Sequence, residues 1–170
     1  MMFTILLAAT AAATPIVAQD TPGLAPKLVS ESKAAIADVL EKGCQAFAAG
    51  DISGAMAPYS EDVLLYDIAP PYRTSYQQLK EANAALRGMM AETPRCTYKD
   101  MQITIVAPDF AYAIYLLPYA ARLKNGRQLN VQGRGTDLFR KIDGKWMIVH
   151  EHFSVPADPM TGKAELVPPE

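Results

Sequence analysis

The sequence predicts an α+β fold in which a curved, cone-shaped antiparallel sheet wraps around three N-terminal helices. Two observations carry this prediction. Apolar residues recur at helical spacing in the first half of the chain, whereas long runs of strand-forming residues begin after Cys96. These runs are separated by turn-forming pairs that are typical of hairpins, namely Pro108-Asp109, Asn125-Gly126 and Asp143-Gly144.

The first 18 residues, MMFTILLAATAAATPIVA, form an almost unbroken apolar run that ends before the polar pair Gln19-Asp20. This run is too short and too rich in alanine for a comfortable membrane span, and it fits a secretory signal peptide cut after Ala18. We therefore expect a periplasmic or secreted protein. Because no Lys or Arg precedes the run, a misassigned start or an uncleaved membrane anchor is the alternative.

Removal of this segment leaves about 150 residues, which is the size of one domain. We place a leader at residues 19–29, the domain at 30–156 and an extended tail at 157–170. The formal net charge of −2 argues against nucleic acid as a partner, since phosphate binding needs a basic surface. The sequence contains no phosphate-binding or dinucleotide-binding glycine motif, no CxxC pair and no HExxH, so we expect no cofactor.

Three helices and one short strand are expected before the long strands. In order, they cover residues 30–49 (helix), 52–59 (helix), 62–67 (strand) and 75–90 (helix). The expected N-caps are Ser30 or Ser32 for the first helix and Asp51 or Ser53 for the second. The residues of the third helix that we expect to face inward are Leu79, Ala82, Leu86, Met89 and Met90.

The four long strands are expected to form an antiparallel meander. They cover residues 97–106, 111–124, 129–141 and 145–155. Asn-Gly and Asp-Gly favour two-residue turns because both central residues adopt positive φ there. Strands of this length curl strongly, so the sheet should form a half-open cone that the helices close. Gly133 and Gly135 lie two apart and permit bending or close approach on one face.

The last hairpin contains the only tryptophan and both histidines of the chain. Strict alternation along a strand predicts two faces. One face carries Trp146, Ile148, His150 and His152, and the other carries Met147, Val149, Glu151 and Phe153. The arrangement indicates a pocket at the end of an apolar ribbon without indicating a reaction.

Two stretches of the chain resemble a known superfamily. LFRKIDGKWMIVHEHFS (138–154) is similar to the hairpin of the calcium/calmodulin-dependent kinase II association domain and of SnoaL-like proteins, and AAGDISGAMAPYSEDVLLYD (48–67) is similar to the early part of ketosteroid isomerases. All belong to the nuclear transport factor 2-like superfamily, whose cystatin-like fold has the same order of elements. The resemblance covers residues 30–156 and implies the fold more strongly than the function.

The resemblance to the isomerases implies roles for two acids. Asp67 falls at the position of the carboxylate base, and Asp137 falls at that of the acid in the oxyanion hole. The tyrosine partner of that family falls on or beside Gly43, so this donor is missing. The residues that are candidates to replace it are Tyr66, Tyr112, Tyr115 and Tyr119.

The alternative is structural. Asp67 then caps a turn before Ala69-Pro70-Pro71, and Asp137 forms an ion pair with Arg134 or Arg122. An apolar cavity would nevertheless raise the pKa of a carboxyl group. We expect Leu64, Phe139, Val149 and Phe153 to line that cavity. Glu151 should point into it and form a like-charge pair with one of the two aspartates, so that one acid is protonated near neutral pH.

His150 and His152 share one strand face, but no third metal ligand is visible in the sequence, so we predict no metal. We expect one histidine to form a hydrogen bond within the sheet or at the outer sheet face, where two copies of the chain would pair as a homodimer. The residues assigned to a pocket or interface are Tyr66, Phe139, His150, His152 and Phe153.

The sequence allows two states for Cys44 and Cys96. In an exported chain they form a disulfide between the first helix and the start of the strands, and otherwise they are free buried thiols.

Two classes of function remain open. The first is a binding protein with an apolar pocket for a small apolar ligand. The second is a cofactor-free acid–base enzyme, an isomerase, dehydratase or cyclase, that acts on an apolar carbonyl compound with Asp67, Asp137 and Glu151 as catalytic groups. The burial of the carboxyl groups discriminates between them, because an enzyme of this kind needs a carboxyl group of raised pKa in an open cavity.

Overall fold

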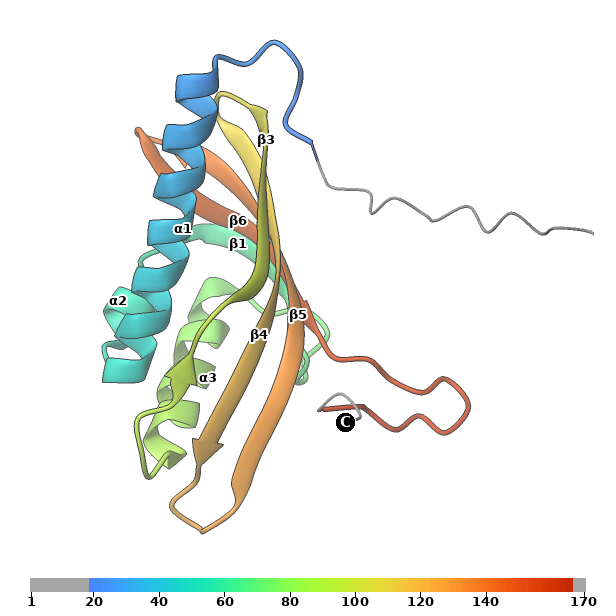
Figure 1. Cartoon of the computed structure of the whole chain (residues 1–170). Coiled ribbons are helices and arrows are strands. Elements are labelled where there is room, and N and C mark those ends of the chain that lie inside the picture. Colours follow the sequence, from blue (N-terminus) through green and yellow to red (C-terminus); the bar gives the residue numbers. More distant parts are fainter. Residues whose placement is uncertain (1–18, 167–170) are drawn as a thin grey trace, which may run out of the picture.

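The computed structural model describes residues 19–166, and its curved sheet carries the helices on the concave side (Figure 1). In chain order the elements are α1 (Pro26–Ala49), α2 (Ile52–Met56), β1 (Tyr59–Tyr66), α3 (Tyr76–Met89), β2 (Arg95–Cys96), β3 (Lys99–Ala107), β4 (Phe110–Arg122), β5 (Gln128–Ile142) and β6 (Lys145–Ser154). The predicted α+β class with a curved, unclosed sheet is confirmed. The predicted signal segment and residues 167–170 of the predicted tail lie outside the described residues.

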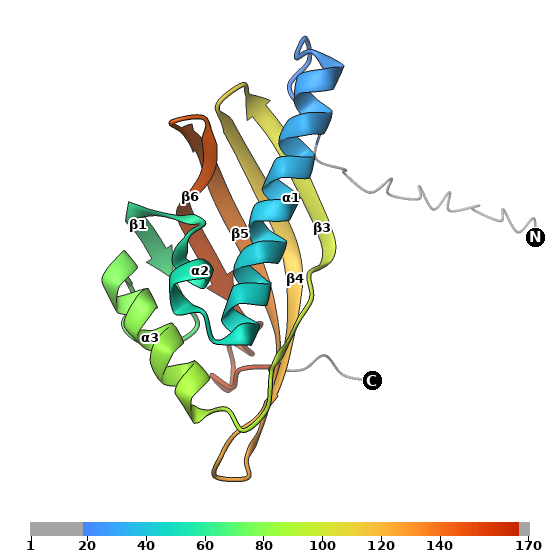
Figure 2. The same ribbon diagram turned by 90° about the vertical axis from the view of Figure 1, so that its left-hand side faces the viewer.

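The sheet has six strands, in the order β1-β6-β5-β4-β2, and β3 pairs with β4 as well. The predicted meander of four long strands is present as β3 to β6. The sequence did not reveal that β1 joins the sheet parallel to β6. A parallel pair between distant segments leaves no local turn signal, so the pattern around residues 62–67 indicates a strand but not its neighbour. Figure 2 shows α1 and α3 side by side in front of this sheet.

The first helix begins earlier than predicted. It starts at Pro26, which occupies the first turn, where its missing N–H costs nothing. Ser30 and Ser32 are therefore helical residues rather than caps, and the Ser30 hydroxyl donates to the carbonyl oxygen of Lys27 at 3.0 Å. Gly50 ends the helix with a φ of 84°, as glycine does at helix C-termini.

The caps of the two shorter helices follow the sequence. The Asp51 carboxylate accepts a hydrogen bond from the backbone N–H of Gly54, and Ser75 forms a capping box with Gln78. The second helix ends at Met56 rather than at Tyr59, because Tyr59 already belongs to β1. In α3, Met89 lines the cavity as expected but is 52% exposed, so it lies at the cavity wall rather than in the core.

The two glycine hairpins differ. At Asp143-Gly144 both residues have positive φ, and Ile142 pairs with Lys145, so the predicted two-residue turn is confirmed. At Asn125-Gly126 only the glycine has positive φ. The Asn125 side chain instead accepts a hydrogen bond from the N–H of Arg127, and this local bond favours a longer loop.

Both ends of the described chain return to the sheet. The backbone of Thr21 and the carboxylate of Asp20 bond to the backbone of Ile105 on β3. At the other end, residues 155–166 form a loop with a turn around Asp158, and the carbonyl oxygen of Leu166 accepts a hydrogen bond from the N–H of Gln132 on β5. This part of the tail is thus folded back rather than simply extended.

The core lies between the helices and the concave face of the sheet. Its fully buried members include Ile36, Met56, Leu65, Phe139 and Ile148. Of the two alternatives for the cysteines, the structure has the disulfide, which links Cys44 on α1 to Cys96 on β2. Within residues 19–166, no helix is both long and apolar enough to cross a membrane.

Candidate functional site

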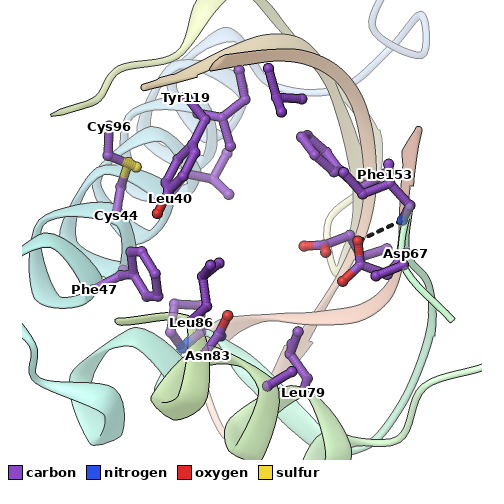
Figure 3. Close-up of a pocket in the computed structure, with 18 of the residues that line it drawn as sticks. Leu40, Cys44, Phe47, Asp67, Leu79, Asn83, Leu86, Cys96, Tyr119 and Phe153 are labelled. Carbon is purple, nitrogen blue, oxygen red and sulfur yellow. Dashed lines mark hydrogen bonds between the residues drawn. A yellow bond between two sulfur atoms is a disulfide. The ribbon is translucent and has the colours of Figure 1, made fainter. Parts of the chain in front are cut away.

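A cavity of about 480 Å³ lies between α1, α3 and the concave face of the sheet. Figure 3 shows its walls: Leu79, Asn83 and Leu86 come from α3, Phe47 and the Cys44–Cys96 disulfide form one side, and Phe153 and Asp67 lie opposite. Most of this lining is apolar, but it also includes two carboxyl groups and four tyrosines. The acids are Asp67 and Glu151, and the tyrosines are Tyr59, Tyr98, Tyr115 and Tyr119.

A β-bulge in β6 decides which side chains enter the cavity. Ile148 pairs with Phe139 and His150 pairs with Leu138, so Val149 is an extra residue on β6. The strict alternation predicted for this strand is therefore wrong. Before the bulge, Ile148 faces inward, and after it Glu151 and Phe153 face inward, so all three line the cavity.

Glu151 is the central acid of the cavity wall. Tyr59, at the start of β1, donates a hydrogen bond from its hydroxyl to Oε2 of Glu151 at 2.6 Å. The pKa of Glu151 is raised to about 7: burial in the apolar wall raises it most, the hydrogen bond from Tyr59 lowers it, and the charge of Asp67 raises it. At neutral pH this carboxyl group thus exists in both protonation states.

Asp137 lies directly beside Glu151, since the two residues face each other across β5 and β6. The side chain is fully buried, and its two oxygens accept the hydroxyl of Tyr115 at 3.2 and 3.1 Å. The pKa of Asp137 is well above its ordinary value. Burial is the larger cause, and the charge of Glu151 is the smaller one. The alternative that Asp137 forms an ion pair with Arg134 or Arg122 is wrong, and Arg122 lies beside Glu92 instead.

Gly133 and Gly135 make this arrangement possible. Their inward faces are covered by aromatic rings, so that a Cβ on Gly135 would overlap the ring of Tyr115 and a Cβ on Gly133 would overlap the ring of Phe153. The expected close approach at these glycines is confirmed. The missing side chain at Gly135 leaves room for the ring of Tyr115, whose hydroxyl bonds to Asp137.

Asp67 both caps a turn and lines the cavity, so the two alternatives considered for it are not exclusive. Its Oδ1 accepts a hydrogen bond from the N–H of Ile68 at 2.6 Å, which caps the turn after β1, and its side chain also lines the cavity. Burial raises its pKa, whereas backbone hydrogen bonds from Ile68 and Ala69 lower it. Asp67 is therefore a second acid in the cavity wall, and its charge raises the pKa of Glu151.

The five residues assigned to a pocket or interface separate into three groups. Phe153 lines the cavity, and Phe139 lies in the core. Tyr66, His150 and His152 gather on the outer face of β1 and β6, where the tyrosine ring meets both imidazoles edge-on at centroid distances of 5.5 and 6.3 Å. Nδ1 of His150 lies 2.8 Å from the carbonyl oxygen of Leu64, which is a hydrogen bond between the strands.

No group of three His, Cys, Asp or Glu side chains within residues 19–166 is arranged to hold a metal ion. Three of the four residues expected to line the cavity, Leu64, Phe139 and Val149, do not do so. The bulge explains Val149, because it follows the last inward residue before the alternation changes.

Sequence reasoning missed Tyr59 and Tyr98. Tyr59 stands at the predicted end of the second helix, and Tyr98 stands near the predicted start of a strand. Burial, together with the charges of Glu151 and Asp137, raises the pKa of both phenols, so both stay protonated. The sequence does not indicate that these tyrosines lie near the acids. Tyr59 is in β1, Tyr98 is between β2 and β3, and the acids are in β5 and β6, so the three segments are distant in sequence.

Residues 36–158 match the family model described as a SnoaL-like domain. No curated protein gives a significant match.

Several solved structures share the fold. An NTF2-like protein of unknown function from Pseudomonas putida is 24% identical, with a TM-score of 0.70, and the match covers 82% of this chain and 98% of that one. A ketosteroid isomerase-like protein from Erwinia carotovora is 20% identical (TM-score 0.62; 73% and 95% covered). An uncharacterised protein with a cystatin-like fold from Caulobacter vibrioides is 19% identical (TM-score 0.62; 77% and 93% covered). At these identities the likeness shows the fold alone.

Proposed function

The chain belongs to the SnoaL-like domain family, and from this premise we propose that it is an exported enzyme that performs cofactor-free acid–base chemistry on a small apolar carbonyl compound. The observation that carries the proposal is Glu151, a carboxyl group with a pKa of about 7 in the wall of an apolar cavity. A general base works best when its pKa lies near the working pH. The reaction class is isomerisation, dehydration or cyclisation.

Glu151 is the proton carrier in this proposal. Its carboxylate removes a proton from the carbon next to the carbonyl group, and the electrons of the C–H bond form a C=C bond while the carbonyl electrons move to oxygen. The protonated Glu151 then returns the proton to another atom of the same molecule, so no cofactor is consumed. The hydrogen bond from Tyr59 holds the carboxylate in one orientation during both steps.

Asp137 acts through Tyr115 rather than directly. It is fully buried and lies behind the cavity wall, so its oxygens reach a ligand only by way of the phenol. The Tyr115 hydroxyl donates to both oxygens of Asp137, and these bonds fix the position of the phenol in the cavity wall. Asp137 is thus a positioning residue for Tyr115, and the resemblance-based role of a direct donor is not proposed.

The lining restricts the ligand. None of the described residues in the cavity wall is Lys, Arg or His, whereas the acids Asp67 and Glu151 both lie there. An anionic ligand would meet repulsion without a compensating charge. A neutral, apolar molecule of one to three rings suits both the lining and the volume of about 480 Å³.

Export is part of this proposal. The Cys44–Cys96 disulfide supports it, because structural disulfides persist in oxidising compartments such as the periplasm. A second candidate function is a non-catalytic binding protein that pairs as a homodimer through the outer sheet face. The apolar cavity supports this candidate as well, but a carboxyl group with a pKa near neutrality has no role in it.

Deuterium exchange tests the proposal without knowledge of the natural substrate. The two-ring ketone 1-tetralone is incubated with the protein in heavy water, and deuterium uptake next to the carbonyl is followed by mass spectrometry. We expect exchange above the buffer rate, and loss of Glu151 as the base in Glu151→Gln to lower it by about 100-fold or more. Glu61→Gln, an exposed acid on β1, is the matched control.

The two functions give different results. If 1-tetralone stabilises the protein against heat but exchanges no faster than in buffer, the binding function is correct and the enzyme proposal fails. The same assay on Asp67→Asn and Asp137→Asn assigns the remaining acids. If deuterium exchange and ligand binding are unchanged in both variants, neither Asp67 nor Asp137 has a role in the site.

A further inference from the structure

A second hollow, of about 350 Å³, lies on the opposite side of the sheet from the cavity. Cys96 and Tyr98, on β2 and on its connection to β3, line the cavity. The residues that alternate with them, Arg95, Thr97 and Lys99, line the second hollow. Successive residues of an extended chain point to opposite faces, so the two sites are separated by the sheet itself. The helices lie on the other face (Figure 1), and we call this hollow the outer groove.

The floor and the far side of the outer groove come from β4 and β5. Pro118 and Ala120 on β4 present small side chains, whereas their partners across the sheet, Gln132 and Asn130 on β5, present amides. On the other side, Arg95 on β2 pairs with Ala120. The outer groove is thus a shallow apolar floor between two rows of longer polar side chains.

The outer groove carries positive charge. Arg95 and Lys99 line it, and none of the described residues in its lining is Asp or Glu. Neither cation forms an ion pair within residues 19–166. The cavity on the helix side has the opposite character, since its lining includes two acids and no described Lys, Arg or His. An anion is therefore attracted to the outer groove and repelled from the cavity.

Three uncharged polar side chains lie in the same groove, namely those of Thr97, Asn130 and Gln132. None of them makes a side-chain hydrogen bond within the part of the chain that the structure describes. An amide group and a hydroxyl group each offer both a donor and an acceptor. The hydroxyl groups of a sugar need the same combination, so these side chains suit a ligand with several hydroxyl groups.

We infer that the outer groove is a binding site for a sugar acid, a small molecule with several hydroxyl groups and one carboxylate. The guanidinium of Arg95 binds the carboxylate, because its planar pair of N–H donors matches the two oxygens. Lys99 adds to the attraction, and the amides of Asn130 and Gln132 bind hydroxyl groups. A volume of about 350 Å³ suits a ligand of about one or two sugar rings. This site is independent of the reaction proposed for the cavity.

Three ligands with related rings test both parts of this recognition. D-Galacturonate has the carboxylate and the hydroxyl groups, D-galactose has hydroxyl groups without the carboxylate, and cyclohexanecarboxylate has the carboxylate without hydroxyl groups. Each is titrated into ¹⁵N-labelled protein at low salt, and the NMR signals of the side-chain amides of Asn130 and Gln132 report binding at the groove. We expect D-galacturonate to shift these signals and to bind about 10-fold more tightly than either of the other two.

Substitutions of exposed residues test the roles of the side chains. Arg95→Gln removes the charge and keeps a long polar side chain, and it should weaken D-galacturonate by about 10-fold. Lys124→Gln makes the same change of charge at an exposed lysine outside the groove, and it should leave the affinity unchanged. Asn130→Ala should weaken D-galacturonate by about 3- to 10-fold, as expected for one hydrogen bond.

Four results would overturn the inference. The first is the absence of binding of D-galacturonate at millimolar concentration, and the second is binding that shifts the signals of cavity residues instead of those of Asn130 and Gln132. The third is equal affinity for D-galacturonate and either of the other ligands, which would show that the hydroxyl groups or the carboxylate are not recognised. The fourth is equal weakening by Arg95→Gln and Lys124→Gln, which would show only a general effect of charge.

The outer groove and the cavity are tested separately. Arg95 does not line the cavity, so Arg95→Gln should exchange deuterium into 1-tetralone at the wild-type rate. Binding of D-galacturonate without any exchange in the wild type would support the outer groove and reject the proposed reaction. Exchange without binding of D-galacturonate would support the reaction and reject the sugar-acid site.

Discussion

The raised pKa of Glu151 makes the stability of the protein depend on pH in a defined direction. The pKa is about 7 in the folded protein and has its ordinary value of 4.5 in the unfolded chain. Between these two values the unfolded chain has released the proton and the folded protein still holds it. The free energy of unfolding therefore decreases as the pH rises through this range.

The size of the decrease follows from the same two values. The difference between 4.5 and about 7, at about 1.36 kcal/mol per pH unit, corresponds to about 3 kcal/mol. Asp137 acts in the same direction, because burial raises its pKa from 3.8. In Glu151→Gln this contribution disappears, while the amide oxygen still accepts the hydrogen bond from Tyr59.

Urea unfolding at about pH 4.5 and about pH 8 measures this effect. We expect wild-type protein and Glu151→Gln to have similar stability at the lower pH, and the variant to be more stable by about 3 kcal/mol at the higher pH. Glu61→Gln, an exposed acid on the neighbouring strand, should follow the wild type. A ¹³C NMR titration of the labelled glutamate carboxyl groups gives the pKa directly. Parallel stability curves, or a Glu151 midpoint near 4.5, would refute the account of the site.

Three further predictions concern the support of the cavity and the maturation of the chain. Gly135→Ala should lower the free energy of unfolding, measured in urea, by about 1–3 kcal/mol, because the new Cβ would overlap the ring of Tyr115. The control is Gly88→Ala, at a helical glycine with open space around it, which should raise the free energy of unfolding by about 0.5–1 kcal/mol. Equal effects of the two substitutions would contradict the close contact between Gly135 and Tyr115. Reduction of the Cys44–Cys96 disulfide should cost about 4 kcal/mol for its sequence separation of 52, measured in urea with and without reductant, and Cys44→Ser/Cys96→Ser should be insensitive to reductant. Expression of the full sequence in a bacterium should give a periplasmic protein whose intact mass begins at Gln19, and a mass that begins at Met1 would contradict the signal peptide.

Much of the fold was predictable because its signals are local. The helix stop at Gly50, the capping box at Ser75 and the turn at Asp143-Gly144 each depend on a few neighbouring residues. The start of α1 at Pro26 was missed because two serines offered plausible caps, whereas a proline in the first turn is an equally good start. Local signals thus place the elements but leave some boundaries open.

The site was predictable only in part. Asp137 and Glu151 were expected near each other because they lie on consecutive strands of one hairpin. Tyr59 and Tyr98 were not expected, because their contacts with the acids depend on how distant segments meet in three dimensions. The resemblance to the isomerases indicated a missing tyrosine on the first helix, but it did not indicate which tyrosines surround the acids.

The bulge at Val149 also has a consequence for folding. The observed register of the hairpin is bulged, and a regular register without the bulge would reverse the faces of the residues after Ile148. The regular one would turn both histidines toward the helices and leave Glu151 in water, which spares the cost of burying an acid. The bulged one aligns Glu151 with Leu65 on β1 and with Asp137 on β5. The pairing with β1, a segment distant in sequence, is thus made in the register that places an acid in the cavity.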